Sequence, residues 1–178
     1  MTLPPLRLRE ITLDDWPAVH AWASLEQACR YQPWGPNTPE QTRAFVQAAV
    51  DARSRSPRSR YPYAVCLAGE VVGMGELHVR SHGHHQGEIS YILHPRLWGH
   101  GLGTAIGRAL LARGFQELAL HRIHATCDPR NHASAGVLRR IGMTHEGRHR
   151  HTLLTRDGWR DSDVYSILEG DWPGPGGS

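Results

Sequence analysis

Three alternate glycines are the residues of this sequence that point most directly to chemistry. Gly99, Gly101 and Gly103 follow an apolar segment at 89–93 and open a helical pattern, which predicts a helix over 104–118. Glycines at these positions leave successive backbone N–H groups uncovered, at the positive end of a helix dipole. Such a turn stabilises a phosphate or pyrophosphate. A tight turn without a ligand is the alternative, but three alternate glycines favour the anion site.

Two common phosphate-binding patterns do not fit this turn. A P-loop needs a lysine directly after its glycines, and none follows here. A dinucleotide-binding fingerprint needs Gly-x-Gly-x-x-Gly and an acidic residue about 20 positions later, at the end of the next strand. Here the second position after Gly103 is Ala105, and the next predicted strand ends only at Asp128. Both patterns are therefore excluded.

A third pattern, Arg/Gln-x-x-Gly-x-Gly/Ala, is matched by Arg96-Leu-Trp-Gly99-His-Gly101. At these residues the chain resembles the GNAT superfamily of N-acetyltransferases, in which this pattern forms the pyrophosphate loop for acetyl-CoA. The resemblance extends over roughly 6–172, and its ending looks like the RimJ/RimL branch, which acetylates the N-termini of ribosomal proteins. The supporting matches are Asn131-x-x-Ser134, Arg140-Ile-Gly-Met143, Glu146-Gly147, Asp157-Gly-Trp-Arg-Asp161 and Tyr165 to Trp172.

The resemblance implies a set of residues that bind acetyl-CoA. A main-chain N–H at the end of the preceding strand would also polarise the thioester carbonyl. Asn131 would hydrogen-bond the pantetheine arm, whose amides would pair with the backbone of Ile92, Leu93 and His94. The pyrophosphate would be wrapped by Arg96, Leu97, Trp98, Gly99, His100, Gly101, Leu102, Gly103 and Thr104.

The resemblance also implies an acid for the departing thiolate. Many superfamily members place a tyrosine on the helix that follows Asn131, but this chain has Leu138 there. Ser134, one turn earlier, is the proposed acid, as in the ribosomal branch. The alternative interpretation makes Asn131 a helix N-cap and Ser134 a surface serine.

A general base is harder to assign. The glutamate that the ribosomal branch can use corresponds here to Leu153, which weakens the case for a ribosomal substrate. Glu88 is the proposed base, acting through water, and Glu76 on the neighbouring strand is the second candidate. Both could instead be ordinary strand carboxylates. A terminal amine with a pKa near 8 needs little help, so a dedicated base is not required.

The pattern of elements predicts a single α/β domain at 1–172 with a flexible Pro/Gly tail at 173–178. Strands and helices alternate in the second half, which predicts a mixed sheet with one parallel crossover at the glycine turn. The GNAT resemblance implies a mostly antiparallel sheet of about seven strands flanked by about four helices. We expect strands at 6–10, 63–68, 71–79, 87–93, 122–127, 143–153 and 161–169, and helices at 12–26, from 38 to the Arg/Ser/Pro stretch, at 104–118 and at 131–142.

Composition narrows the class of protein. A length of 178 residues with 39% hydrophobic residues fits one globular domain, and we expect no membrane span and no signal peptide. Three widely spaced cysteines fit reduced thiols, so a cytoplasmic location is expected. A net charge of +3 is too weak to indicate nucleic acid, and the basic run at 53–60 reads as a solvated loop.

Histidines and aromatic residues suggest further sites. The histidines at 82–85 are expected in a polar turn, and His124 and Cys127 should face opposite sides of their strand, so no metal site is predicted. Trp16, Trp22 and Trp34 are expected in the core or in a groove wall. If Trp34 and Tyr31 line the acceptor cleft, they would attract an amine through cation–π contact.

The resulting prediction is an acetyl-CoA-dependent N-acetyltransferase in which an amine attacks the thioester directly in a ternary complex. The acceptor is a protein N-terminal amine or a small amine such as a polyamine, an amino acid or an aminoglycoside. The alternatives are an acyl-CoA-binding sensor or accessory domain with degenerate catalysis and, more remotely, a basic nucleic-acid-binding domain. No membrane partner is expected, whereas a homodimer is possible because such domains often pair through sheet edges.

Overall fold

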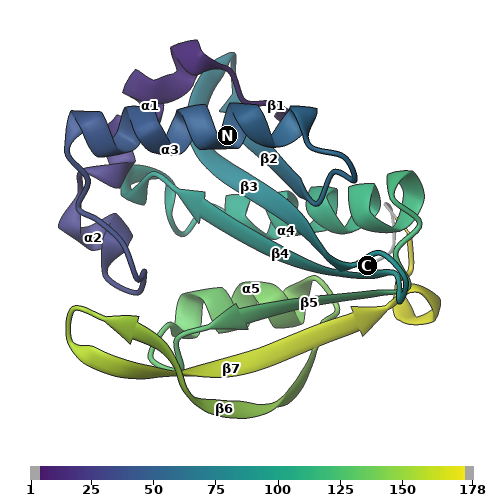
Figure 1. The fold of residues 1–178 in the computed structure, drawn as a ribbon. Helices are drawn as coiled ribbons and strands as arrows, with labels where there is room; N and C mark the ends of the chain where they lie inside the picture. Colours follow the sequence, from purple (N-terminus) through teal and green to yellow (C-terminus); the bar gives the residue numbers. More distant parts are fainter. Residues whose placement is uncertain (1–4, 175–178) are drawn as a thin grey trace.

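The computed structural model describes residues 5–174, and these form one seven-stranded sheet in the order β1-β2-β3-β4-β5-β7-β6. Neighbouring strands are antiparallel except β4 and β5, which are parallel, so the expected mixed sheet with one parallel crossover is confirmed (Figure 1). Residues 175–178 of the expected tail lie outside the described part. The strands are β1 (Leu6–Glu10), β2 (Arg60–Leu67), β3 (Glu70–Ser81), β4 (Gln86–Leu93), β5 (Arg122–Cys127), β6 (Thr144–Thr155) and β7 (Gly158–Leu168).

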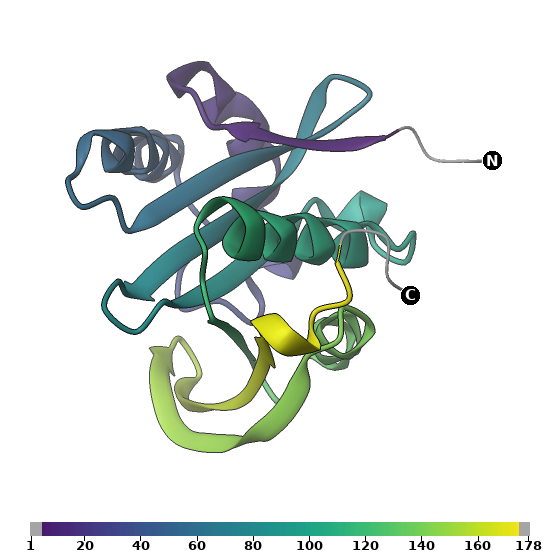
Figure 2. The same cartoon turned by 90° about the vertical axis from the view of Figure 1, so that its right-hand side faces the viewer.

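Helices cover both faces of the sheet (Figures 1 and 2). Two of them, α1 and α3, pack over β2 and β3 on one face, whereas α4 and α5 pack on the other. We call these the α1 face and the α4 face. The helices are α1 (Trp16–Ala23), α2 (Glu26–Cys29), α3 (Pro39–Asp51), α4 (Leu102–Ala112) and α5 (His132–Arg140).

Two helices are shorter than the sequence pattern predicts. The expected helix over 12–26 begins as a 3-10 turn, continues as α1 and ends where the Ser24 hydroxyl donates to the His20 carbonyl at 2.7 Å. Leu25 is extended, so α2 is a separate helix. The helix expected over 104–118 is α-helical only to Ala112 and π-helical over Arg113–Glu117, where the chain crosses closely over β5.

Side-chain alternation along β3 and β4 decides which residues face which helices. A Cβ at Gly75 would lie 3.3 Å from Ile106 of α4, so the odd-numbered residues here face α4. Met74 and its cross-strand partner Ile92 pack into the core cluster under α1. From Met74 to His78 of β3 and from Glu88 to Ile92 of β4, the even-numbered residues therefore lie on the α1 face.

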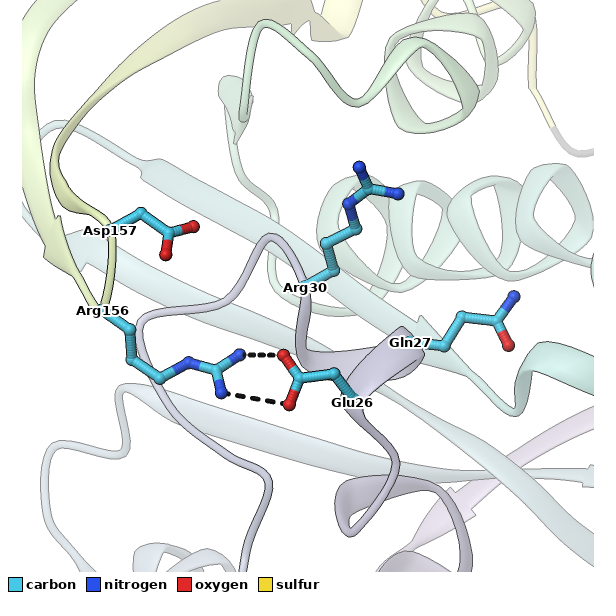
Figure 3. A pocket seen from close by; sticks show the side chains of 5 residues that line it. All are labelled: Glu26, Gln27, Arg30, Arg156 and Asp157. Carbon is cyan, nitrogen blue, oxygen red and sulfur yellow. Dashed lines mark hydrogen bonds and ion pairs between the residues drawn. The ribbon is translucent and has the colours of Figure 1, made fainter.

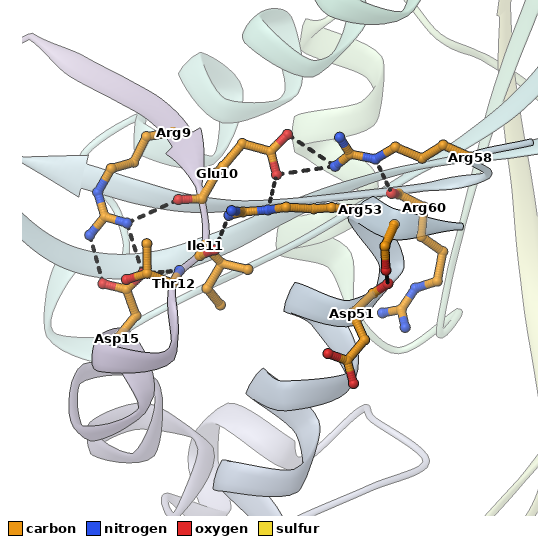
Figure 4. A network of polar contacts seen from close by, with 10 residues as sticks. Arg9, Glu10, Ile11, Thr12, Asp15, Asp51, Arg53, Arg58 and Arg60 are labelled. Carbon is orange, nitrogen blue, oxygen red and sulfur yellow. Dashed lines mark hydrogen bonds and ion pairs between the residues drawn. The ribbon is translucent and has the colours of Figure 1, made fainter. Parts of the chain in front are cut away.

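The basic run expected to be a solvated loop is instead largely held in ion pairs (Figure 4). Arg53 and Arg58 both pair with Glu10 of β1, at 2.8 and 3.0 Å, and Arg60 pairs with Glu76 of β3 at 2.7 Å. All three arginines are only partly exposed. The expectation holds for residues 54–57, which are exposed, and was wrong for these three arginines, because their partners are far away in the sequence and are brought close only by strand pairing.

Asp15 anchors the start of the first helical segment. The Arg9 guanidinium donates to both of its carboxylate oxygens, at 2.6 and 2.7 Å, and the Thr12 N–H donates at 2.7 Å. Burial raises the pKa of Asp15, but these hydrogen bonds outweigh burial, and the net pKa lies below its usual value. A carboxylate with a lowered folded-state pKa stabilises the fold above its unfolded pKa of about 4, and the contribution is lost as the pH falls through the folded pKa.

Asp15→Asn is therefore expected to lower the free energy of unfolding by about 2 kcal/mol at pH 7, because it removes one partner of a half-buried ion pair. The deficit should shrink as the pH falls from about 4 toward the lower folded-state pKa of Asp15, below which the wild-type carboxylate is itself protonated. Urea unfolding at pH 7 and pH 3 measures both effects. Asp14→Asn, on the exposed neighbouring residue, is the control, and equal losses in the two variants would contradict this role of Asp15.

Candidate active site

Strands β4 and β5 separate to form a V-shaped gap in the sheet. They pair over only three rungs, of which Glu88 with His124 is the last. Beyond this rung β4 continues to Leu93 and β5 to Cys127, and the two strands diverge toward α2 and the β6–β7 turn (Figure 1). Strand edges without a partner carry free N–H and C=O groups, so an extended ligand with amides can pair with them.

Leu93 is the residue of the β4 end whose backbone faces this gap. The N–H of His94 donates to the Val72 carbonyl of β3 at 2.9 Å, and alternation turns Ile92 toward the same edge. Leu93 is turned the other way, and its carbonyl accepts a hydrogen bond from the Trp98 indole at 2.9 Å. Of the three residues expected to pair with pantetheine, Leu93 therefore presents its N–H to the gap.

The glycine turn contains a continuous run of unused donors. The N–H groups of residues 96–98 are bound within the turn around Pro95–Leu97, and the Thr104 N–H donates to the Gly101 carbonyl at 3.1 Å. Between them, no group in the described part of the chain accepts from the N–H groups of residues 99–103. This window is narrower than the predicted loop of residues 96–104, and it lies at the N-terminus of α4.

The three glycines of this turn have different tasks. Gly99 and Gly101 have φ of +82° and +76°, and a Cβ at either would meet nothing within 4 Å in the protein. Glycine adopts this left-handed backbone readily, and it leaves the side of the turn where a side chain would stand empty. Gly103 is a packing residue, since a Cβ there would lie 3.2 Å from Val137 of α5. Nearby, the Arg96 guanidinium lies 3.6 Å from the Glu70 carboxylate.

Asn131 and Ser134 begin α5 on the α4 side of the gap. The Oδ1 of Asn131 accepts a hydrogen bond from the Ser134 N–H at 3.0 Å, so Asn131 is a helix N-cap, and its Nδ2 remains as a donor. The Oγ of Ser134 lies 3.2 Å from the Tyr91 hydroxyl. Leu138 is buried in the core.

Tyr91 is a site residue that the sequence analysis missed. Burial raises the pKa of its phenol to about 12, although the hydrogen bond with Ser134 opposes the effect, so the group stays protonated at neutral pH. A signal was available, since Tyr91 alternates with Ile89 and Leu93 and must face α4. Its contact with Ser134, 43 residues later, depends on the docking of α5 and has no sequence signature.

The two candidate bases differ in how their oxygens are occupied. Both oxygens of Glu76 accept from Arg60, at 2.7 and 2.9 Å. In Glu88 the Arg80 Nε donates to Oε2 at 2.6 Å, and no donor among the described residues contacts Oε1. Glu88 is thus the one with a free carboxylate oxygen at the gap. It lies on the α1 face, opposite Ser134 and Tyr91.

A hollow of about 630 Å³ lies between α2 and the β6–β7 turn, the two segments toward which the gap opens (Figures 1 and 3). The Arg156 guanidinium of the turn donates to both oxygens of Glu26, at 2.7 and 3.1 Å, and bridges the two segments. The hollow is lined by Glu26, Gln27, Arg30, Arg156 and Asp157.

The aromatic residues considered for the acceptor side lie mostly in packed environments. Trp34 stacks on Phe45 and meets Trp22 edge-on, with ring centroids 6.5 and 6.3 Å apart. Tyr31 already has the Arg30 and Arg130 guanidinium groups over its ring, at 5.5 and 5.9 Å.

Within residues 5–174, no cluster of three or more His, Cys, Asp or Glu side chains has the geometry of a metal site. His124 lies beside Glu88, whereas Cys127 is buried in the core cluster under α4. None of the described helices is both long enough and apolar enough to traverse a bilayer.

Comparison with known proteins decides the family. The family model described as "Acetyltransferase (GNAT) domain" matches residues 5–144. The chain belongs to the GNAT family. An uncharacterized N-acetyltransferase of Bacillus subtilis, YnaD, is 32% identical over 97% of this chain and 98% of its own length. A Bacillus anthracis GNAT acetyltransferase structure shares 32% identity with a TM-score of 0.81, covering 96% of this GNAT chain and 98% of that one.

Other similar proteins carry names of ribosomal and spermidine N-acetyltransferases. The putative ribosomal N-acetyltransferase YdaF of B. subtilis is 33% identical over 60% of this chain and 58% of its own. Mycobacterium smegmatis RimJ, solved with CoA-disulfide, has the same fold, with a TM-score of 0.82 at 24% identity over 96% and 85% of the two chains. Escherichia coli spermidine N(1)-acetyltransferase is 25% identical over 92% and 86%. This GNAT chain is therefore an acetyl-CoA-dependent acyltransferase.

Proposed function

We propose that this GNAT enzyme transfers acetyl from acetyl-CoA to a primary amine by direct attack in a ternary complex. The observation that carries the proposal is the V-shaped gap with a free carboxylate oxygen of Glu88 on one face and the Ser134–Tyr91 pair on the other. A thioester lying in the gap would have proton acceptor and proton donor on opposite sides. Such an arrangement suits attack from one side and departure of sulfur on the other.

The cofactor end of the site is assigned to backbone groups. The free N–H groups of residues 99–103 would hold the pyrophosphate, supported by the dipole of α4. Pantetheine would extend along β4 and receive a hydrogen bond from the Asn131 Nδ2. The Leu93 N–H, which faces the gap, would donate to an amide oxygen of pantetheine, and a main-chain N–H of β4 nearer to Glu88 would stabilise negative charge on the thioester oxygen in the transition state.

The proton transfers follow from the positions of Glu88 on one face of the gap and of Ser134 on the other. Glu88 takes a proton from the ammonium through a water, and the freed nitrogen lone pair attacks the thioester carbon. The C–S bond breaks, the thiolate receives the proton of the Ser134 hydroxyl, which Tyr91 holds in place, and Ser134 regains a proton through water from the nitrogen of the new amide, so that the second ammonium proton ends on CoA. No acetyl-cysteine is required, and burial raises the pKa of the nearby Cys127 thiol to about 11, which makes it a poor nucleophile at neutral pH.

The acceptor would enter through the hollow between α2 and the β6–β7 turn, since the gap opens toward these two segments. Its lining carries both charges, which suits an amine attached to a polar molecule. Relatives named for ribosomal and spermidine acetylation support two classes of acceptor, protein N-termini and polyamines.

A CoA-release assay with acetyl-CoA and a panel of peptides, polyamines and amino acids tests the proposal. We expect amine-dependent release of CoA with at least one class. Tight acetyl-CoA binding without release for any amine would contradict catalysis and support the alternative acyl-CoA sensor.

Ser134→Ala is expected to lower kcat about 10- to 100-fold while changing the acetyl-CoA dissociation constant less than about twofold, because the acid acts only on the departing sulfur. Steady-state kinetics and calorimetry measure the two quantities. Tyr91→Phe, which leaves Ser134 in place without its partner, should show a smaller loss in kcat. Ser81→Ala, at the far end of β3, is the control. Unchanged activity of Ser134→Ala across the pH range would remove Ser134 from this role.

A further inference from the structure

His124 lies at the apex of the V-shaped gap, where no step described above uses it. It forms the last β4–β5 rung with Glu88, and its Nε2 is 3.7 Å from Glu88 Oε2. The His124 side chain is 25% exposed and the Glu88 side chain 19%, so the imidazole connects the carboxylate with solvent. The pair lies on the α1 face, the side from which the amine would approach.

The charged groups around this pair leave His124 free to exchange protons. From β3, His78 and Arg80 face Glu88, and Arg80 binds its Oε2. From β5, Arg122 is held away by both oxygens of Glu146, at 2.8 and 2.5 Å.

Further along the sheet, Arg60 of β2 and Glu76 of β3 neutralise each other. Ser166 of β7, the rung partner of His124, donates to Glu146 at 2.8 Å. Burial lowers the pKa of His124, although Glu88 opposes this, so the ring is neutral and able to accept a proton at neutral pH.

We propose that His124 acts through Glu88, as a positioning residue: it accepts the transferred proton from Glu88 and releases it to solvent. The inference rests on the proposed role of Glu88 as base. One ammonium proton passes through water to Glu88 and then to His124 Nε2, and the resulting imidazolium releases this proton to solvent. Glu88 is thereby returned to its carboxylate form for the next acceptor. No oxidant, metal or further reactant is needed.

His124→Gln tests this proposal, because an amide can keep a polar contact with Glu88 but cannot carry an extra proton. We expect kcat to fall about 5- to 10-fold, with the KM of acceptor and acetyl-CoA within about twofold. In the wild-type enzyme kcat should decline as the pH falls and His124 becomes protonated. In the variant this inflection should disappear. External imidazole should restore activity to His124→Ala but not to Glu88→Gln.

His78→Gln is the matched control, since His78 is the β3 rung partner of Glu88 and burial lowers its pKa as well. It should keep kcat and the acid-side inflection. If His124→Gln also kept both, or if His78→Gln lost them equally, the proposal would be overturned. If Glu88→Gln lost activity while His124→Gln kept it, only the proposed role of His124 would be overturned. If Glu88→Gln kept full activity, the proposed role of Glu88 as base would be overturned as well.

A second measurement does not depend on turnover or on a variant of His124. With acetyl-CoA bound, the NMR titration of the His124 ring should lie at lower pH in Glu88→Gln than in the wild-type protein, because the carboxylate favours the imidazolium. Identical titrations would show that the two groups are uncoupled and would overturn the proposal. This result is readable even if no amine proves to be a substrate.

Discussion

Gly101→Glu is expected to weaken acetyl-CoA binding by at least about 100-fold, because it places carbon and a negative charge where the pyrophosphate would lie. A Cβ at Gly101 meets nothing in the protein, so the residue is glycine for its φ of +76° and for the space outside it. The left-handed backbone adds a folding cost of about 1 to 2 kcal/mol. Isothermal calorimetry with CoA and a thermal melt separate the two effects.

Gly158→Glu is the matched control for that experiment. Gly158 has φ of +105° and equally open surroundings, but it lies in the β6–β7 turn, away from the glycine turn. It should lose similar stability and keep CoA affinity. Equal affinity in the two variants would show that residues 99–103 are not the pyrophosphate site.

Glu88→Gln is expected to reduce kcat about 100-fold at pH 7, since general base catalysis contributes roughly this much or more. The defect should shrink as the pH rises through the pKa of the acceptor, because the amine then arrives without its proton. A pH series of kcat/KM with one acceptor measures the effect. Glu76→Gln, one strand away on the same face but bound at both oxygens by Arg60, should remain within about threefold of wild type. Loss of equal size in both variants, independent of pH, would point to a structural role of these carboxylates.

The sequence is most informative where a local pattern determines the structure. The helix expected from 38 is α3, which Thr38 caps with a hydroxyl that accepts from the Gln41 N–H. The strand predicted over 122–127 has those limits in the structure. The glycine turn is also predictable from local sequence, because two left-handed residues just before a helix favour glycines at a characteristic spacing. Such signals need no knowledge of distant segments.

The remaining features depend on contacts between distant segments. Tyr91 meets Ser134 only after α5 docks on the sheet, and Arg53 and Arg58 find Glu10 only after β1 pairs with β2. For the same reason, the free N–H groups cover only residues 99–103 and not the whole predicted loop of residues 96–104. Which N–H groups remain free is decided by the path of the turn and not by its composition.

The bridge between Glu26 and Arg156 has a consequence for the conditions under which acceptors are compared. It joins residues 130 apart in the chain, yet both side chains are largely in solvent, at 70% and 51% exposure. Ion pairs of this kind hold weakly and are screened by salt. The rim of the hollow is therefore sensitive to ionic strength while the buried walls of the gap are not. Changing the salt concentration alone should alter the ranking of bulky and small acceptors, so a substrate profile from one buffer describes one state of the rim.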